Sequence, residues 1–118
     1  MRYKNIFALA FLGLSLCVSG EYFIEITPNN ESGFYEMKVD EVVTFRVAAY
    51  EKSQNSNVLI SLDNTIWWEY NRSLLEKVSS DAASITLKAV SEGNSELSAT
   101  TIVKNSHCLK KINILIIK

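Results

Sequence analysis

The sequence predicts an all-β protein, an antiparallel β-sandwich of seven to eight strands in a single domain. Beyond Glu21, apolar and polar residues alternate, which is the period of an extended strand rather than of a helix. No window repeats apolar residues at helical spacing behind an N-terminal cap. Short apolar runs are instead separated by segments rich in Asn, Asp, Ser and Gly, the pattern of a sandwich built from short strands.

The N-terminal residues have the features of a secretory leader. Two basic residues precede the apolar run Ile6–Val18, which is too short for a comfortable membrane span, and Val18-Ser19-Gly20 offers small or tolerated residues for cleavage. We therefore expect a signal peptide over residues 1–20 and a mature domain over residues 21–118. Such a protein is secreted or held at the cell surface.

The two cysteines bear on the same question. Leu14-Ser15-Leu16-Cys17 resembles a lipobox, so the alternative to a soluble secreted protein is a lipoprotein with a lipid anchor at Cys17. Cleavage after Gly20 removes Cys17, and lipidation uses up its sulfur. Either way Cys108 is left without an internal partner, and we expect a buried small hydrophobe there; intermolecular pairing is the less favoured reading.

The strands follow one another with short connections. The predicted runs are residues 22–27, 43–49, 58–62, 65–70, 75–78, 85–89, 97–101 and 112–116. The polar segment 51–57 has no periodicity and is expected to be a loop, with a turn at Asp63-Asn64. Residues 58–70 are too long for one strand, so they are either two short strands or an insertion.

The stretch that carries both tryptophans is the most informative part of the chain. In an extended strand, successive side chains point to opposite faces, so Trp68 enters the core when Trp67 and Glu69 face outward. An exposed Trp67 suggests a binding surface, unless the 51–57 loop or Tyr50 covers it. Tyr35 belongs to a second candidate patch with Phe34, where one of the two rings should face the core.

A pattern of residues around Trp68 resembles the bacterial immunoglobulin-like domain, group 2. The matching positions are Trp68, Leu75, Val78, 85–90, Gly93 and 97–100, preceded by 37–45 as the entry into the second strand, with Asp40 where a Gly is usual. The resemblance implies an immunoglobulin-like antiparallel β-sandwich of surface and secreted proteins, often adhesins, with no chemistry of its own. It also implies that Trp68, Leu75 and Val78 anchor the core. The departure at Asp40 leaves the conformation of that turn open.

Catalytic and cofactor chemistry finds little support in the residues. His107 is the only histidine, and its neighbour Cys108 points to the opposite face of an extended strand, so the two do not form a dyad. One His and one Cys do not make a zinc site, and no spaced calcium motif or phosphate-binding glycine loop is present. We therefore expect no enzyme activity, no cofactor and no metal.

Charge and hydropathy exclude two classes of partner. Without residues 1–20 the chain has ten basic and thirteen acidic residues, a net charge of −3, which disfavours nucleic-acid binding. No later apolar stretch is long enough for a membrane span. The expected partner is a protein or another cell-surface component.

Two other functions remain open. Chagasin-type inhibitors of cysteine proteases are also secreted single immunoglobulin-like domains, but their three loop motifs are not matched by residues 63–66, 79–82 and 101–104. A structural accessory domain is the second alternative, in which an edge strand such as residues 109–117 completes another protein's sheet.

Overall fold

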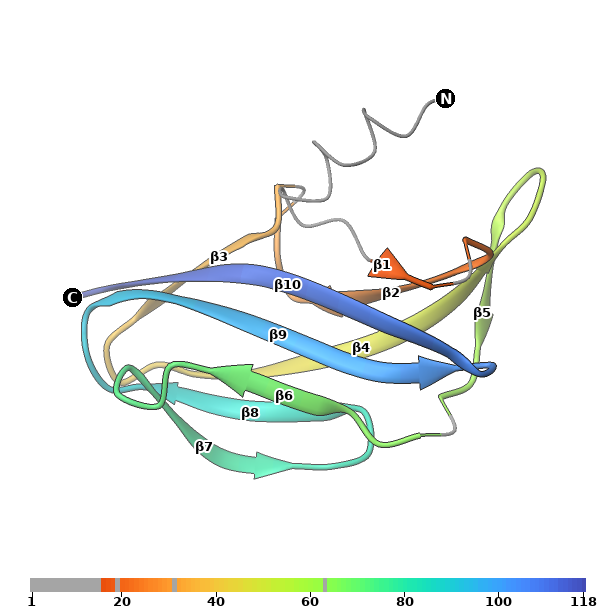
Figure 1. Ribbon diagram of the computed structural model, residues 1–118. Helices are drawn as coiled ribbons and strands as arrows, with labels where there is room; N and C mark the ends of the chain where they lie inside the picture. Colours follow the sequence, from red (N-terminus) through yellow and green to blue (C-terminus); the bar gives the residue numbers. More distant parts are fainter. Residues whose placement is uncertain (1–15, 19, 31, 63) are drawn as a thin grey trace.

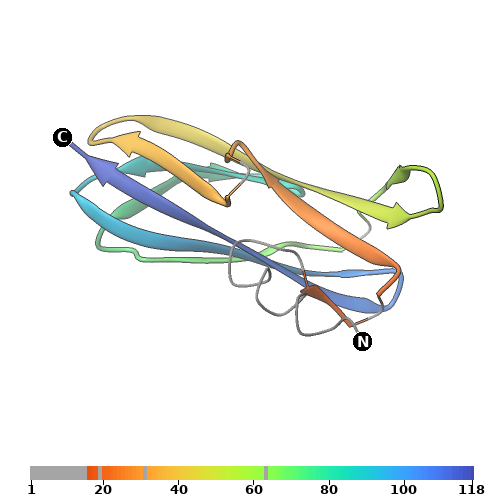
Figure 2. The same cartoon turned by 90° about the horizontal axis from the view of Figure 1, so that it is seen from above.

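A computed structural model describes residues 16–18, 20–30, 32–62 and 64–118 of the protein. In this part of the chain two five-stranded sheets lie face to face (Figure 1; Figure 2). The predicted fold class, an all-β antiparallel sandwich, is confirmed. Most of the predicted signal peptide, residues 1–15 and 19, lies outside the described residues, as does Asp63 of the predicted turn.

The first sheet has the order β1-β10-β9-β6, with β3 also paired to β10, and the second has the order β2-β4-β8-β7, with β5 also paired to β4. The strands of the first sheet are β1 (Leu16–Cys17), β3 (Phe34–Lys38), β6 (Trp67–Tyr70), β9 (Gly93–Val103) and β10 (Ser106–Ile117). Those of the second are β2 (Tyr22–Thr27), β4 (Val42–Lys52), β5 (Asn57–Ile60), β7 (Leu75–Ser80) and β8 (Ser84–Ala89). All pairs are antiparallel except β3–β10.

The ten strands of the described chain exceed the predicted seven to eight for identifiable reasons. Strands β1 and β3 are not among the predicted strands. Residues 58–70 form two short strands, β5 and β6, which belong to different sheets. The proposal that residues 109–117 form a free edge is wrong, because β10 pairs with β9 on one side and with β1 and β3 on the other.

The chain passes from one sheet to the other between β2 and β3. The crossing contains the cis Thr27–Pro28 peptide and a turn organised by Asn30. The Asn30 Oδ1 accepts hydrogen bonds from the backbone N–H of Ser32 (2.9 Å) and of Phe34 (3.0 Å), and Gly33 supplies the positive φ of 80° that the turn requires. As a result β2 borders the second sheet and β3 borders the first.

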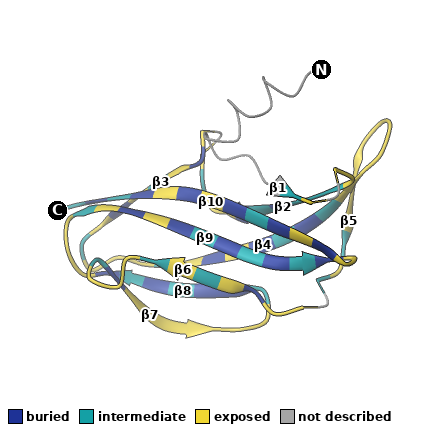
Figure 3. Ribbon diagram, in the orientation of Figure 1, coloured by how far each residue is buried: buried dark blue, intermediate teal, exposed yellow. Residues whose placement is uncertain are grey.

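The core lies between the sheets and follows the alternation of the long strands. Buried and exposed residues alternate along β9 and β10 (Figure 3). Phe45 is fully buried on β4, and the ring of Tyr35 meets it edge-on with centroids 5.5 Å apart. Other fully or almost fully buried side chains are Ile24, Ile26, Met37, Leu75, Ile85, Leu87, Leu97, Ile112, Ile114 and Ile116.

Asp40 adopts the backbone conformation for which glycine is the usual residue. Its φ is 77°, its N–H donates to the Ala89 carbonyl (2.7 Å), and Glu41 accepts the N–H of Lys38 through its carboxylate (2.9 Å). Asp tolerates the left-handed region better than most non-glycine residues. The conformation that the sequence leaves open at this turn is therefore the left-handed one.

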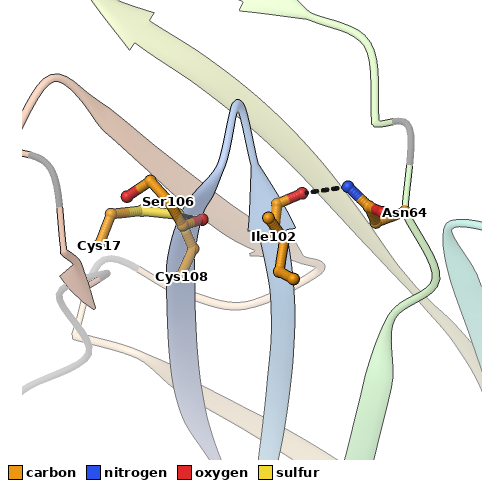
Figure 4. Close-up of a disulfide and its surroundings, with 5 residues drawn as sticks. All are labelled: Cys17, Asn64, Ile102, Ser106 and Cys108. Carbon is orange, nitrogen blue, oxygen red and sulfur yellow. Dashed lines mark hydrogen bonds between the residues drawn. A yellow bond between two sulfur atoms is a disulfide. The ribbon is translucent and has the colours of Figure 1, made fainter.

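The expectation that Cys108 has no internal partner is wrong. Cys17 and Cys108 form a disulfide (Figure 4). They are direct partners in the β1–β10 ladder, where Leu16 pairs with Leu109. The N–H of Val18 donates to the His107 carbonyl (2.9 Å) and extends this pairing by one residue. The prediction is wrong because it places Cys17 in a cleaved leader, whereas the register makes Cys17 and Cys108 partners on β1 and β10.

Val78 is not a core anchor either. Leu75 is 1% exposed, but Val78 is 56% exposed. The two residues are separated by an odd number of positions in an extended strand, so their side chains point to opposite faces. The register shift between Lys77 and Ser79 leaves Val78 outside the regular ladder with β8.

Candidate binding surface

Trp67 is the most prominent exposed aromatic side chain of the described residues. It is 68% exposed and lies on β6, the border strand of the first sheet. In the register of this sheet Trp67 faces Thr100 of β9, and Thr100 faces Leu109 of β10. Because cross-strand partners point to the same side of a sheet, these three side chains form a column across its outer face.

The surface around this column is called here the Trp67 face. It comprises Trp67, Glu69, Ser98, Thr100, Ile102 and Leu109. Ile102 and Leu109 are half-buried, so the face is apolar at one end, while Glu69 accepts a 3.3 Å hydrogen bond from the Trp67 indole N–H. That contact orients the ring and leaves most of its surface open.

Neither Tyr50 nor the 51–57 loop buries the Trp67 side chain. Tyr50 stacks on Phe23, with ring centroids 5.1 Å apart and planes 18° apart, on strands β2 and β4 of the other sheet. The loop between β4 and β5 projects beyond the sandwich (Figure 1). The indole is thus open to a partner.

Trp68 points the other way and packs, half-buried, against the core. Its indole N–H is buried and has no hydrogen-bond partner among the described residues. A cavity of about 240 Å³ lies beside it, between the border strands β6 and β7, with Ile66, Lys77 and Ile85 among its lining residues. The two tryptophans therefore have different environments, as the alternation of a strand requires.

A second, polar hollow of about 510 Å³ lies next to Glu69, and Asn71, Asn94 and Ser98 contribute to it. In its wall the Arg72 guanidinium lies 4.8 Å from the centre of the Tyr70 ring and donates to the Tyr70 hydroxyl (3.1 Å). Lys111 and Glu96 form an exposed ion pair (3.8 Å) on another side of it. Charges of both signs line the hollow, so it does not favour an anion or a cation.

Contrary to the prediction, Tyr35 does not belong to the binding surface. It lies on β3 with its ring half-buried against Phe45, on the same side of the strand as Met37, which is 1% exposed. The neighbouring Phe34 is the exposed member, at 45%. The sequence indicates that one of the two rings faces inward, and the parallel pairing of β3 with β10 decides that it is Tyr35.

An apolar column on the outer face of the second sheet was not predicted. Phe23 of β2 faces Tyr50 of β4, and Tyr50 faces Leu59 of β5. Leu59 is 66% exposed. The alternation of residues 43–49 carries the signal for this column, but the predicted strand ends one residue before Tyr50, and the polar segment 51–57 is expected to be a loop.

His107 and Cys108, the two residues considered for a catalytic dyad, differ in exposure on β10. His107 is exposed, whereas Cys108 is buried and bonded to Cys17. No three His, Cys, Asp or Glu side chains gather there as metal ligands, and no helix there is long and apolar enough to cross a membrane. The pKa of Asp81 is lowered, chiefly by a hydrogen bond from the Ser84 hydroxyl (2.8 Å), which belongs to a tight turn.

The geometry thus offers an exposed tryptophan on a regular sheet, two apolar columns on opposite faces and a mixed-charge hollow. Comparison of the chain with protein-family models, curated proteins and solved structures finds no match.

Proposed function

We propose that the protein is an exported, non-enzymatic immunoglobulin-like binding module that contacts a protein partner, at the cell surface or outside the cell, through the Trp67 face. The observation that carries this proposal is the 68% exposure of Trp67 on β6, a border strand held in register by β9. A large apolar ring held open on a regular strand is typical of the centre of a protein interface.

The size of the effect can be worked from the exposed area. The Trp67 side chain has an area of roughly 150–250 Å² and is 68% exposed. Covering the exposed part contributes about 3–4 kcal/mol to the binding free energy, at roughly 25 cal/mol per Å². That gain, together with the gain from the surrounding contacts, must offset the loss of translational and rotational freedom on binding. The half-buried Ile102 and Leu109 extend the apolar surface beside the ring.

The resemblance to the bacterial immunoglobulin-like domain supports the class of the module. The two-layer sandwich is of the expected type, and Asp40, which stands where that family has Gly, has the positive φ of 77° that suits Gly. Val78 departs from the pattern, since it is exposed. Membership of the family rests on these local features and remains part of the proposal.

A pair of matched variants tests the proposal. Trp67→Ala and Leu59→Ala each remove a side chain of similar exposure, 68% and 66%, from opposite faces of the sandwich. Proteins captured from cell-surface extracts by the wild type and by Leu59→Ala, but lost with Trp67→Ala, are partners of the Trp67 face. With such a partner purified, Trp67→Ala should weaken binding by roughly 30-fold, the loss of about 2 kcal/mol typical of a central aromatic.

Equal binding by all three proteins would refute a role for the Trp67 face. Loss of binding with Leu59→Ala alone would move the site to the opposite sheet. The melting temperatures of both variants should stay close to that of the wild type, because neither side chain is in the core.

One observation favours the inhibitor of cysteine proteases as a second candidate. The β5–β6 connection, the β7–β8 turn and the β9–β10 turn lie at the same end of the sandwich (Figure 1). The Asn64 side chain joins the first of these to the end of β9, just before the third, by donating to the Ile102 carbonyl (2.9 Å; Figure 4). An inhibitor of this kind presents three loops to a protease cleft. Slow, tight inhibition of papain by the purified protein would establish that function, and full papain activity at a large excess of the protein would exclude it.

A further inference from the structure

The segment before β2 is built into the fold as part of both sheets. Leu16 and Cys17 pair with Leu109 and Cys108, and the chain then turns at Gly20 and enters β2 of the second sheet. The Glu21 carbonyl accepts the Lys52 N–H (2.8 Å), so pairing resumes directly after the turn. Figure 4 shows the Cys17 and Cys108 side chains joined between β1 and β10.

Cleavage after Gly20 would remove Leu16, Cys17 and Val18, the residues that contact β10. Cys108 is 1% exposed and faces the interior, so the cut would leave a buried thiol without its partner sulfur. The His107 carbonyl would lose the Val18 N–H, and the ladder partners of Cys108 and Leu109 on that side would also disappear. A new unpaired sheet edge would result at the start of the last strand.

We propose that the exported protein keeps Cys17, that its leader is removed at the Ser15–Leu16 bond, and that Cys17 and Cys108 are linked in the mature chain. The bond Ser15–Leu16 follows Gly13-Leu14-Ser15, which places small residues at the two positions that leader peptidases read. Hydrolysis adds one water across this peptide bond and leaves a carboxylate on Ser15 and the new amino terminus on Leu16. The first residues of the mature chain are then β1 itself.

The chemistry of the Cys17 sulfur makes this state incompatible with a lipid anchor at that residue. A diacylglyceryl thioether occupies the Sγ atom that the disulfide needs. In the linked state two S–H bonds are broken and one Sγ–Sγ bond forms. The two electrons and two protons pass to a disulfide-bearing oxidoreductase of the exported compartment, which is reduced to its dithiol.

The test is a mass measurement on the full chain, expressed with its own N-terminus in a bacterial host and recovered from outside the cytoplasm. We expect Leu16 to be the first residue of the recovered chain. No cysteine should react with an alkylating reagent before reduction, and a non-reducing digest should contain two peptides joined through Cys17 and Cys108. A mature chain that starts at Glu21 with an alkylatable Cys108 would overturn the proposal. So would a lipid-modified Cys17 whose processing is blocked by globomycin, or an unprocessed chain with both thiols reduced.

Two matched leader variants distinguish the cleavage sites. Ser15→Leu should abolish processing at the proposed bond, while Gly20→Leu should leave both the N-terminus and the disulfide unchanged. The second substitution is compatible with the fold, because a Cβ at Gly20 has nothing within 4 Å and its φ is not in the left-handed region. The reverse pattern, with processing lost only in Gly20→Leu, would refute the proposal. This test is independent of the binding proposal, since it measures no partner.

Discussion

The sheets are joined by an ion pair whose two partners differ in burial. Lys110 points inward from β10 with a side chain that is 7% exposed, and its Nζ lies 3.4 Å from Oε1 of Glu25 on β2. The Glu25 side chain is 40% exposed. The Glu25 carboxylate is the counter-charge of the buried Lys110 ammonium group, whereas the carboxylate itself is also in contact with solvent.

This asymmetry predicts unequal effects of removing either partner. Glu25→Gln leaves a buried ammonium without its counter-charge; fully buried pairs lose about 3–5 kcal/mol in this way, and partial exposure of Glu25 reduces the expected loss to about 2–3 kcal/mol. Lys110→Met replaces the buried charge by an apolar chain of similar length and leaves a carboxylate that water can solvate. We expect this variant to lie within about 1 kcal/mol of the wild type, in either direction.

Urea unfolding at neutral pH of the wild type, both single variants and the double variant measures these differences. The double variant should resemble Lys110→Met, because the cost of Glu25→Gln exists only while Lys110 is present. In thermal unfolding, Glu25→Gln should lower the melting temperature by roughly 10 °C or more. Equal losses for the two single variants, or a larger loss for Lys110→Met, would refute the reasoning.

Three further predictions concern the packing and the turns. Leu75→Ala should cost about 2–5 kcal/mol in urea unfolding, while Val78→Ser should change stability by less than about 0.5 kcal/mol, and a large loss in Val78→Ser would contradict its exposed position. Asp40→Gly should be neutral or stabilising and Asp40→Val should cost about 1–2 kcal/mol, since a β-branched residue is disfavoured at positive φ; equal stability of the two variants would argue against that backbone conformation. The lowered pKa of Asp81 stabilises the folded chain above the usual carboxyl pKa, and this contribution disappears as the pH falls through the folded pKa. Asp81→Asn should therefore be less stable than the wild type at neutral pH, with the difference vanishing in acid; a difference independent of pH would assign the effect to the turn's shape alone.

Alternation alone predicted much of the sandwich from the sequence. The long strands β4, β9 and β10 have clear period-two patterns, and the opposite environments of Trp67 and Trp68 follow from the same rule. The class of fold depends only on such local periodicity, which is why it can be read without knowing which strands pair.

What the sequence did not reveal depends on pairing and register. Tyr35 faces inward because β3 lies parallel to β10, a long-range arrangement without a local signal. Lys110 sits in the interior although charged residues are rarely buried, because Glu25 on another strand lies within 3.4 Å. The disulfide was not predicted for a different reason: the apolar run before Cys17 indicates a cleaved leader, which leaves Cys108 without a partner.

The link between Cys17 and Cys108 also determines how the chain carries mechanical load. In a mature chain that begins at Leu16, a pull between its two ends passes from Cys17 through the sulfur atoms into Cys108 and then along β10 to the C-terminus. Residues 18–107, which contain every residue of the Trp67 face except Leu109, lie outside that path. In that linked chain, tension applied between Leu16 and Ile117 is therefore carried by the disulfide and β10, and the loop of chain between the two cysteines is not stretched between these points.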